Sequence, residues 1–150
     1  MFALAVGAMI ALVFFTMIVS RLIHHQSFAA PLIPSLMILM APFEVGFLAY
    51  IKFTQQVDTF SGLLLYFGLF IFLVLAPKVF RKGIPFATGW WAISFSMAAL
   101  AIASLKYSMF AQCWPVTMIA IMLLAMLTIA IVVLSVRTLH ILLNGKLLAG

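Results

Sequence analysis

Long apolar stretches dominate the sequence, and short polar breaks separate them. Each stretch is close to the ~20 residues that an α-helix needs to cross ~30 Å of hydrocarbon. None of them alternates with the two-residue period of a membrane β-barrel. The pattern therefore predicts an all-α membrane protein with five transmembrane helices in a single domain. The predicted spans are residues 2–20, 32–51, 59–77, 86–105 and 116–136, followed by a tail over 137–150.

Polar residues and prolines mark the ends of these stretches. Asp58 stands where its side chain can cap the third helix, and Pro77 stands at the predicted end of that helix. Pro85 and Pro115 fall near the first turns of the fourth and fifth helices, where a missing N–H is tolerated. Asn144-Gly145 is the predicted stop of the last helix, beyond the lipid.

The overall composition supports a membrane protein and weakens other classes. Hydrophobic residues make up 68% of the 150 positions and charged residues 7%, whereas a soluble surface exposes far more charge. The net charge is +6, but the basic residues are scattered and form no stripe that would bind nucleic acid. The lone cysteine, Cys113, excludes an internal disulfide and a cysteine-based metal cluster.

The distribution of basic residues predicts the orientation through the positive-inside rule. Six of the eight basic residues fall on one side of the predicted spans, and only Lys52 and Lys106 fall on the opposite side. We therefore expect a cytoplasmic C-terminus in the cell (inner) membrane, with Met1 outside. An N-terminus outside the cell is expected if an odd number of transmembrane spans precedes this chain in a longer protein. The basic residues on the predicted cytoplasmic side are Arg21, Lys78, Arg81, Lys82, Arg137 and Lys146.

The second and fourth helices carry the features of inner helices. The second contains Pro42 and Gly46, and the fourth combines Gly89 with threonine and serines. Pro42 leaves the carbonyl of Ile38 without its usual donor, which membranes tolerate where the backbone faces protein or a wet cavity. The first, third and fifth helices are predicted to face lipid.

Two unlike faces run along the fourth helix at ~100° per residue. Phe95 lies among small residues on one face, and the bulky Ile93, Met97 and Leu100 on the other are predicted to face lipid. An aromatic at helical spacing usually fills a core. A hydrophobic side chain that projects into an open bore is also one way in which channels gate. Phe95 is therefore either a packing residue or a plug.

Glu44 is the only acidic residue inside a predicted span. A charge at that depth costs roughly 2.5 to 3.5 kcal/mol on insertion scales. Glu44 is therefore either a site on an ion or proton path, or a carboxyl that is hydrogen-bonded between helices or reaches toward the outer interface. Lys78, Arg81 and Lys82 either concentrate anions at a cytoplasmic mouth, contact anionic lipid, or serve topology alone.

The chain has no recognisable catalytic or metal-binding motif. His24 and His25 are adjacent, so on a helix they diverge by ~100° and cannot chelate one metal together. These residues and His140 are expected near the cytoplasmic surface. No Ser/His/Asp set, Gly-rich phosphate loop or metal-spaced cluster falls within the spans. We expect neither an enzyme nor a cofactor nor a metal site.

The run GWWAISFSMAALAIASLKYS, preceded in order by RLIHHQS and LMAPFEVGFLAY, resembles the tellurite-resistance/dicarboxylate transporter (TDT) family. This family includes the bacterial TehA proteins and the plant slow anion channels. Its pattern at this place is approximately W-W, a small residue, an aromatic, Ser or Thr, then Phe-Pro. Here Ile93 replaces the aromatic and Ser96 replaces the proline. The resemblance covers nearly the whole chain.

The resemblance implies a ten-helix channel built from five hairpins, in which the odd-numbered helices line a pore and three copies form a trimer. This chain would be the C-terminal half, and the N-terminal five-helix half would be missing from it. Phe95 would be the gate, and Pro42, Gly46 and Gly89 would kink the pore helices. The candidate pore-lining residues would be Trp91, Ala98, Ala99, Ile102 and Glu44.

The expected function is a channel or exporter for small anions such as halide, nitrate, tellurite or C4-dicarboxylates. Its partners would be these anions and the lipid bilayer. One alternative is a truncated or split half with no transport of its own, which acts only as an assembly partner. A further alternative is a small exporter that forms its path by oligomerising.

Overall fold

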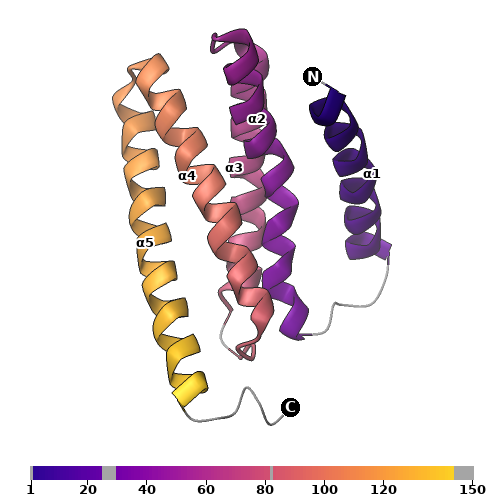
Figure 1. The fold of residues 1–150 in the computed structure, drawn as a ribbon, viewed down its shortest axis with the longest axis vertical. Helices are drawn as coiled ribbons and strands as arrows, with labels where there is room; N and C mark the ends of the chain where they lie inside the picture. Colours follow the sequence, from indigo (N-terminus) through magenta and orange to yellow (C-terminus); the bar gives the residue numbers. More distant parts are fainter. Residues whose placement is uncertain (1, 25–29, 82, 144–150) are drawn as a thin grey trace.

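The computed structural model describes residues 2–24, 30–81 and 83–143. The five helical stretches run alternately up and down, with η1 continuing into α2 and η2 into α4, and the end of α5 lies at the same end of the molecule as the α3–α4 connection (Figure 1). Five helical stretches are long and apolar enough to cross a membrane, which confirms the predicted fold class. The elements are α1 (Phe2–His24), η1 (Ala30–Met40), α2 (Ala41–Thr54), α3 (Thr59–Val79), η2 (Thr88–Trp90), α4 (Trp91–Ala111) and α5 (Trp114–Leu143).

The helix ends follow the local signals in the sequence with small shifts. Asp58 caps α3, because its carboxylate accepts the Ser61 N–H at 2.9 Å while the Ser61 hydroxyl accepts the Asp58 N–H at 3.0 Å. Pro77 lies in the last turn of α3, which continues two residues further, to Val79, and does not end at the proline. Pro85 precedes the helix instead of opening it, since the turn of η2 begins at Thr88. The predicted stop at 144–145 lies outside the described residues.

The residues that were expected to kink the inner helices lie at or near changes of helix type. Pro42 falls in the first turn of α2, directly after the 3-10 segment η1. Gly46 lies within α2. Gly89 belongs to η2, ahead of α4, and a Cβ on it would lie 2.7 Å from the Ser35 Oγ. Gly89 therefore lets η2 approach η1 closely.

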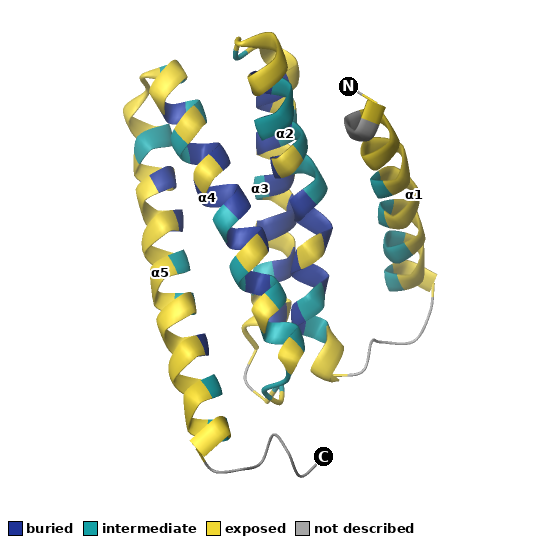
Figure 2. Cartoon of the chain, in the orientation of Figure 1, coloured by how far each residue is buried: buried dark blue, intermediate teal, exposed yellow. Residues whose placement is uncertain are grey.

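The core lies between η1, α2, α3 and α4, where most of the buried positions are found (Figure 2). The central position of the second and fourth helical stretches agrees with the sequence prediction. The third helix was predicted to face lipid, and this is wrong for one of its faces, where Leu65, Phe72 and Leu75 are buried. Gly62 and Gly68 on that face allow close packing, as small residues do between membrane helices.

The first and last helices lie at the sides of this core (Figure 1). An aromatic cluster joins α1 to the centre, with the Phe15 ring 5.1 Å from Phe43 and 6.1 Å from Phe67. Helix α5 packs along α4 and buries Leu123 and Leu134. Both outer helices leave most of their surface exposed (Figure 2).

Candidate functional site

The face of α4 that carries Phe95 is open in this five-helix unit. The Phe95 side chain is 60% exposed, and Trp91 and Ile102 are 41% and 47% exposed. Ala98 is half-buried and Ala99 is buried beside them. Their spacing of three and four residues places them along one stripe of the helix, here called the Phe95 stripe.

The opposite face of α4 forms the core, so the prediction that it faces lipid is wrong. Ile93, Met97 and Leu100 are each no more than 1% exposed. Helix α4 packs against η1, α2, α3 and α5, and its bulky side chains fill the space between these elements. The small face is consequently the more exposed one among the described residues, most clearly at Phe95.

The two tryptophans hold the start of α4 in place. The Trp91 indole N–H donates to the Thr138 hydroxyl of α5 at 3.2 Å, and the Trp90 indole N–H donates to the Pro85 carbonyl at 2.9 Å. The Trp90 ring also lies nearly parallel to the Phe86 ring, at 19°. Tryptophans that pair an apolar ring with a bonded N–H are typical of the membrane interface.

Glu44 lies in the core and not on the exposed stripe. Its side chain is fully buried, and neither carboxylate oxygen has a hydrogen-bond partner among the described residues. It presses against α3 at Gly68, where an added Cβ would lie 2.6 Å from the Glu44 Oε1. Glu44 therefore lies between helices, but the hydrogen bond that was expected to hold it there is not made to any described residue.

The predicted basic cluster is only partly described. Lys78 and Arg81 are exposed at the end of α3, and Lys82 lies outside the described residues. This is the lower end of the molecule in Figure 1, where α4 begins and α5 ends. The described basic residues of the α3–α4 connection and Arg137 thus share one end of the bundle.

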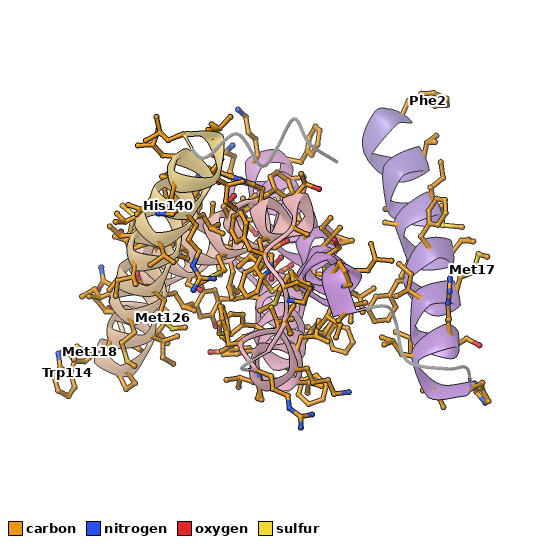
Figure 3. The ribbon with its side chains drawn as sticks, turned by 90° about the horizontal axis from the view of Figure 1, so that it is seen from below. Phe2, Met17, Trp114, Met118, Met126 and His140 are labelled. Atoms are coloured by element: carbon orange, nitrogen blue, oxygen red, sulfur yellow. The ribbon has the colours of Figure 1, made fainter. Side chains whose placement is uncertain are left out.

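The histidines are not brought together in the part of the chain that the structure describes. His24 is exposed, with its Nδ1 3.0 Å from the Ser20 carbonyl, and His25 lies outside the described residues. His140 is exposed near the end of α5 (Figure 3). No group of three or more histidine, cysteine or acidic side chains lies together among the described residues.

A polar hollow at the opposite end of the bundle was missed by sequence reasoning. It has a volume of about 610 Å³ and is lined in part by Asp58, Tyr66 and Tyr107. The Tyr66 and Tyr107 rings lie 5.8 Å apart, although α3 and α4 carry them in distant parts of the sequence. A tyrosine near a span end resembles any interfacial aromatic, so no local signal could have paired these two.

The fold defines a multi-pass membrane protein in which one stripe of the central helix α4 is exposed. The chain belongs to the family described as "Voltage-dependent anion channel" (SLAC1), which it matches over residues 1–139. This confirms the predicted family and the expectation that the chain is not an enzyme.

Several Arabidopsis thaliana proteins are similar to this chain. It is 29% identical to the S-type anion channel SLAH3 over 138 residues, which are 91% of this chain and 22% of SLAH3. It is 31% identical to the S-type anion channel SLAH2 over 108 residues, 71% of this chain and 21% of SLAH2. It is 27% identical to the guard cell S-type anion channel SLAC1 over 139 residues, 92% of this chain and 25% of that protein.

The chain spans about a quarter or less of the length of these three relatives, between 21% and 25%. No solved structure matches it significantly.

Proposed function

We propose that this chain forms part of an anion channel whose bore runs along the Phe95 stripe and is gated by Phe95. The observation that carries the proposal is the orientation of α4, the helix that contacts most of the other elements. It buries its bulky face and leaves a phenylalanine 60% exposed beside alanines. A hydrophobic side chain in an otherwise open bore blocks ions and water.

The other residues of the stripe have supporting roles in this proposal. Trp91 and Ile102 line the bore on either side of Phe95, and Ala98 and Ala99 leave room for the ring to move. Lys78, Arg81 and Lys82 raise the local concentration of anions at the cytoplasmic mouth. Conduction then needs no cofactor, because it depends on a wide path that binds ions weakly.

The ionic selectivity is inferred from the family. The similar Arabidopsis proteins are named as anion channels, so small anions are the proposed substrates. Halide, nitrate, tellurite and C4-dicarboxylates are the candidates. Transport measured for each of these anions in turn distinguishes them.

Further helices are proposed to complete the bore. The Phe95 stripe has no neighbour among the described residues that would form the opposite wall, and the chain covers only 22% of SLAH3. In the proposed whole protein an N-terminal five-helix half faces α4, the C-terminus is cytoplasmic in the inner membrane, and three copies assemble. The alternative is a chain that has no transport of its own and acts only in assembly. Anion flux measured with the chain alone in liposomes tests these alternatives. Flux would show a self-sufficient channel, whereas no flux is expected if the chain needs an N-terminal half or acts only in assembly.

Replacing Phe95 with alanine in the complete channel tests the gate. We expect anion current to rise severalfold at equal surface expression, because removal of the ring opens the bore. Phe70→Ala is the matched control, since Phe70 is similarly exposed at 58% but lies on α3. An unchanged current in Phe95→Ala, with normal expression, contradicts the gate assignment.

A further inference from the structure

A second feature of α4 lies away from the Phe95 stripe. A groove of about 380 Å³ runs between α4 and α5, within the range of sites that hold small molecules. Its α4 wall includes Ile93 and Met97, which lie about 200° around the helix from Phe95. The groove and the candidate bore therefore open on different sides of the helix. The α5 wall is formed by Met126, Ile129, Ala130, Val133 and Leu134.

The length of the groove matches one leaflet of a bilayer. From Arg137 to Met126, α5 rises by about 16 Å, and the hydrocarbon core is ~30 Å thick. The hydrogen bond from Trp91 to Thr138 places Arg137 level with the tryptophans at the start of α4. Since such tryptophans mark the interface, the groove runs from the interface toward the middle of the membrane. Figure 3 shows Met126, at its inner end, on the side of α5 nearer the bundle.

The interfacial end of the groove is positively charged. Arg137 lines this end together with Phe86 and Trp90. The chain has only two acidic residues, of which Glu44 is buried without a partner and Asp58 is bonded to Tyr50 and Ser61. No carboxylate of a described residue therefore neutralises Arg137. A guanidinium at the membrane surface binds phosphate through two parallel hydrogen bonds.

We propose that the groove binds an anionic phospholipid, with the phosphate at Arg137 and one acyl chain along Ile93 and Met97. The Trp90 ring forms a fixed wall at the interface, because its N–H donates to the Pro85 carbonyl and its face lies along Phe86. Such a lipid contacts both α4 and α5 at the end of this helix pair that lies away from their connection, where α4 begins and α5 ends. The proposal does not depend on a gating role for Phe95.

Trp90 provides a reporter inside the groove. The chain contains three tryptophans, so Trp91→Phe combined with Trp114→Phe leaves Trp90 as the only one. This variant of the 150-residue chain is reconstituted in vesicles that contain brominated phosphatidylglycerol or, at equal mole fraction, brominated phosphatidylcholine. We expect the brominated phosphatidylglycerol to quench Trp90 fluorescence at least twofold more strongly than the brominated phosphatidylcholine does.

Two further variants separate the phosphate from the acyl chain. Arg137→Gln should reduce quenching by the anionic lipid to the level of the neutral one, while Lys78→Gln, which removes a charge at the same end outside the groove, should not. Ala130→Phe should reduce quenching by both lipids by filling the groove. Ala125→Phe, on the exposed side of α5, is its control.

Three results would overturn the proposal. Equal quenching by the two lipids, unchanged in Arg137→Gln, shows that the groove has no preference for anionic lipid. Quenching by neither lipid, while a variant that keeps only the exposed Trp114 is quenched, shows that protein covers the groove. Equal quenching by the two lipids, combined with a change in Trp90 fluorescence on addition of inorganic phosphate that is lost in Arg137→Gln, shows an anion site without a lipid. Circular dichroism of each variant checks that the helices are retained.

Discussion

Asp58 ties the end of α2 to the start of α3. The Tyr50 hydroxyl donates to its carboxylate at 2.6 Å, and the Ser61 N–H donates at 2.9 Å. Both bonds favour the charged form of the carboxyl group. They lower the pKa of Asp58 below its usual value, the Tyr50 bond having the larger effect.

This lowered pKa predicts how stability depends on pH. A carboxyl group with a depressed pKa in the folded state stabilises the protein fully above its unfolded pKa of ~3.9, and this contribution is lost as the pH falls through the folded value. Thermal unfolding in detergent should therefore show a larger loss of stability below about pH 4 for the wild type than for Asp58→Asn. Asparagine still caps a helix, so the variant should fold at pH 7. Identical pH profiles for the two proteins contradict this account.

Glu44 shows what sequence reasoning could and could not reach at a single residue. An acid inside a span was predicted to lie on an ion or proton path, to be hydrogen-bonded between helices, or to reach toward the outer interface, and the residue alone did not decide among these. In the fold the Glu44 carboxyl lies against Gly68, whose missing side chain provides the space that the carboxyl occupies. A glycine within a helix has many possible uses, so this pairing required the three-dimensional structure.

At the scale of helices, the contact between α2 and α3 depends on Gly68. Because Glu44 is fully buried, a methyl group 2.6 Å from its Oε1 cannot be accommodated by turning the carboxyl into solvent. We expect Gly68→Ala to destabilise the protein by roughly 1 to 3 kcal/mol, as overpacked cores do. Thermal or denaturant unfolding in detergent measures the effect.

A control and a rescue accompany this prediction. Gly7→Ala in α1 should be neutral or slightly stabilising, because nothing lies within 4 Å of a Cβ at that position. Glu44→Ala should recover part of the stability lost in Gly68→Ala, since it removes the side chain that the methyl group meets. Equal effects of the two glycine substitutions would show that Gly68 is not a close contact.

The position of each helix was predictable from the sequence, but the side that each buries was not. Hydropathy marks spans because lipid and protein interiors are both apolar. For the same reason it does not distinguish a lipid-facing Ile93 or Met97 from a buried one. The Asp58 cap was predicted correctly because it depends only on residues within one helical turn. The packing of α3 depends on its neighbours, and its two glycines were the only local signal.

At the scale of the molecule, the five helices have a core on one side of α4 and an open stripe on the other. The family and the central position of α4 make this stripe the best candidate for the wall of an anion path. The resemblance of the WWAISFS run to the family motif identified Phe95 as a candidate, whereas its exposure could be seen only in the fold. The remaining question is whether water or lipid covers the stripe.

Cysteine accessibility answers this question most directly. Cys113 is the only cysteine of this chain, so Cys113→Ser, with any cysteines elsewhere in the complete channel also replaced, provides a clean background. Single cysteines are then placed at Phe95, Ala98 and Ile102, and as controls at Ile121 and Val132 on the exposed side of α5. We expect a charged, membrane-impermeant thiol reagent to modify the three stripe positions and alter anion current, and to leave the two controls unmodified. Failure to modify the stripe positions, or equal modification of the controls, would contradict a water-filled bore along Phe95.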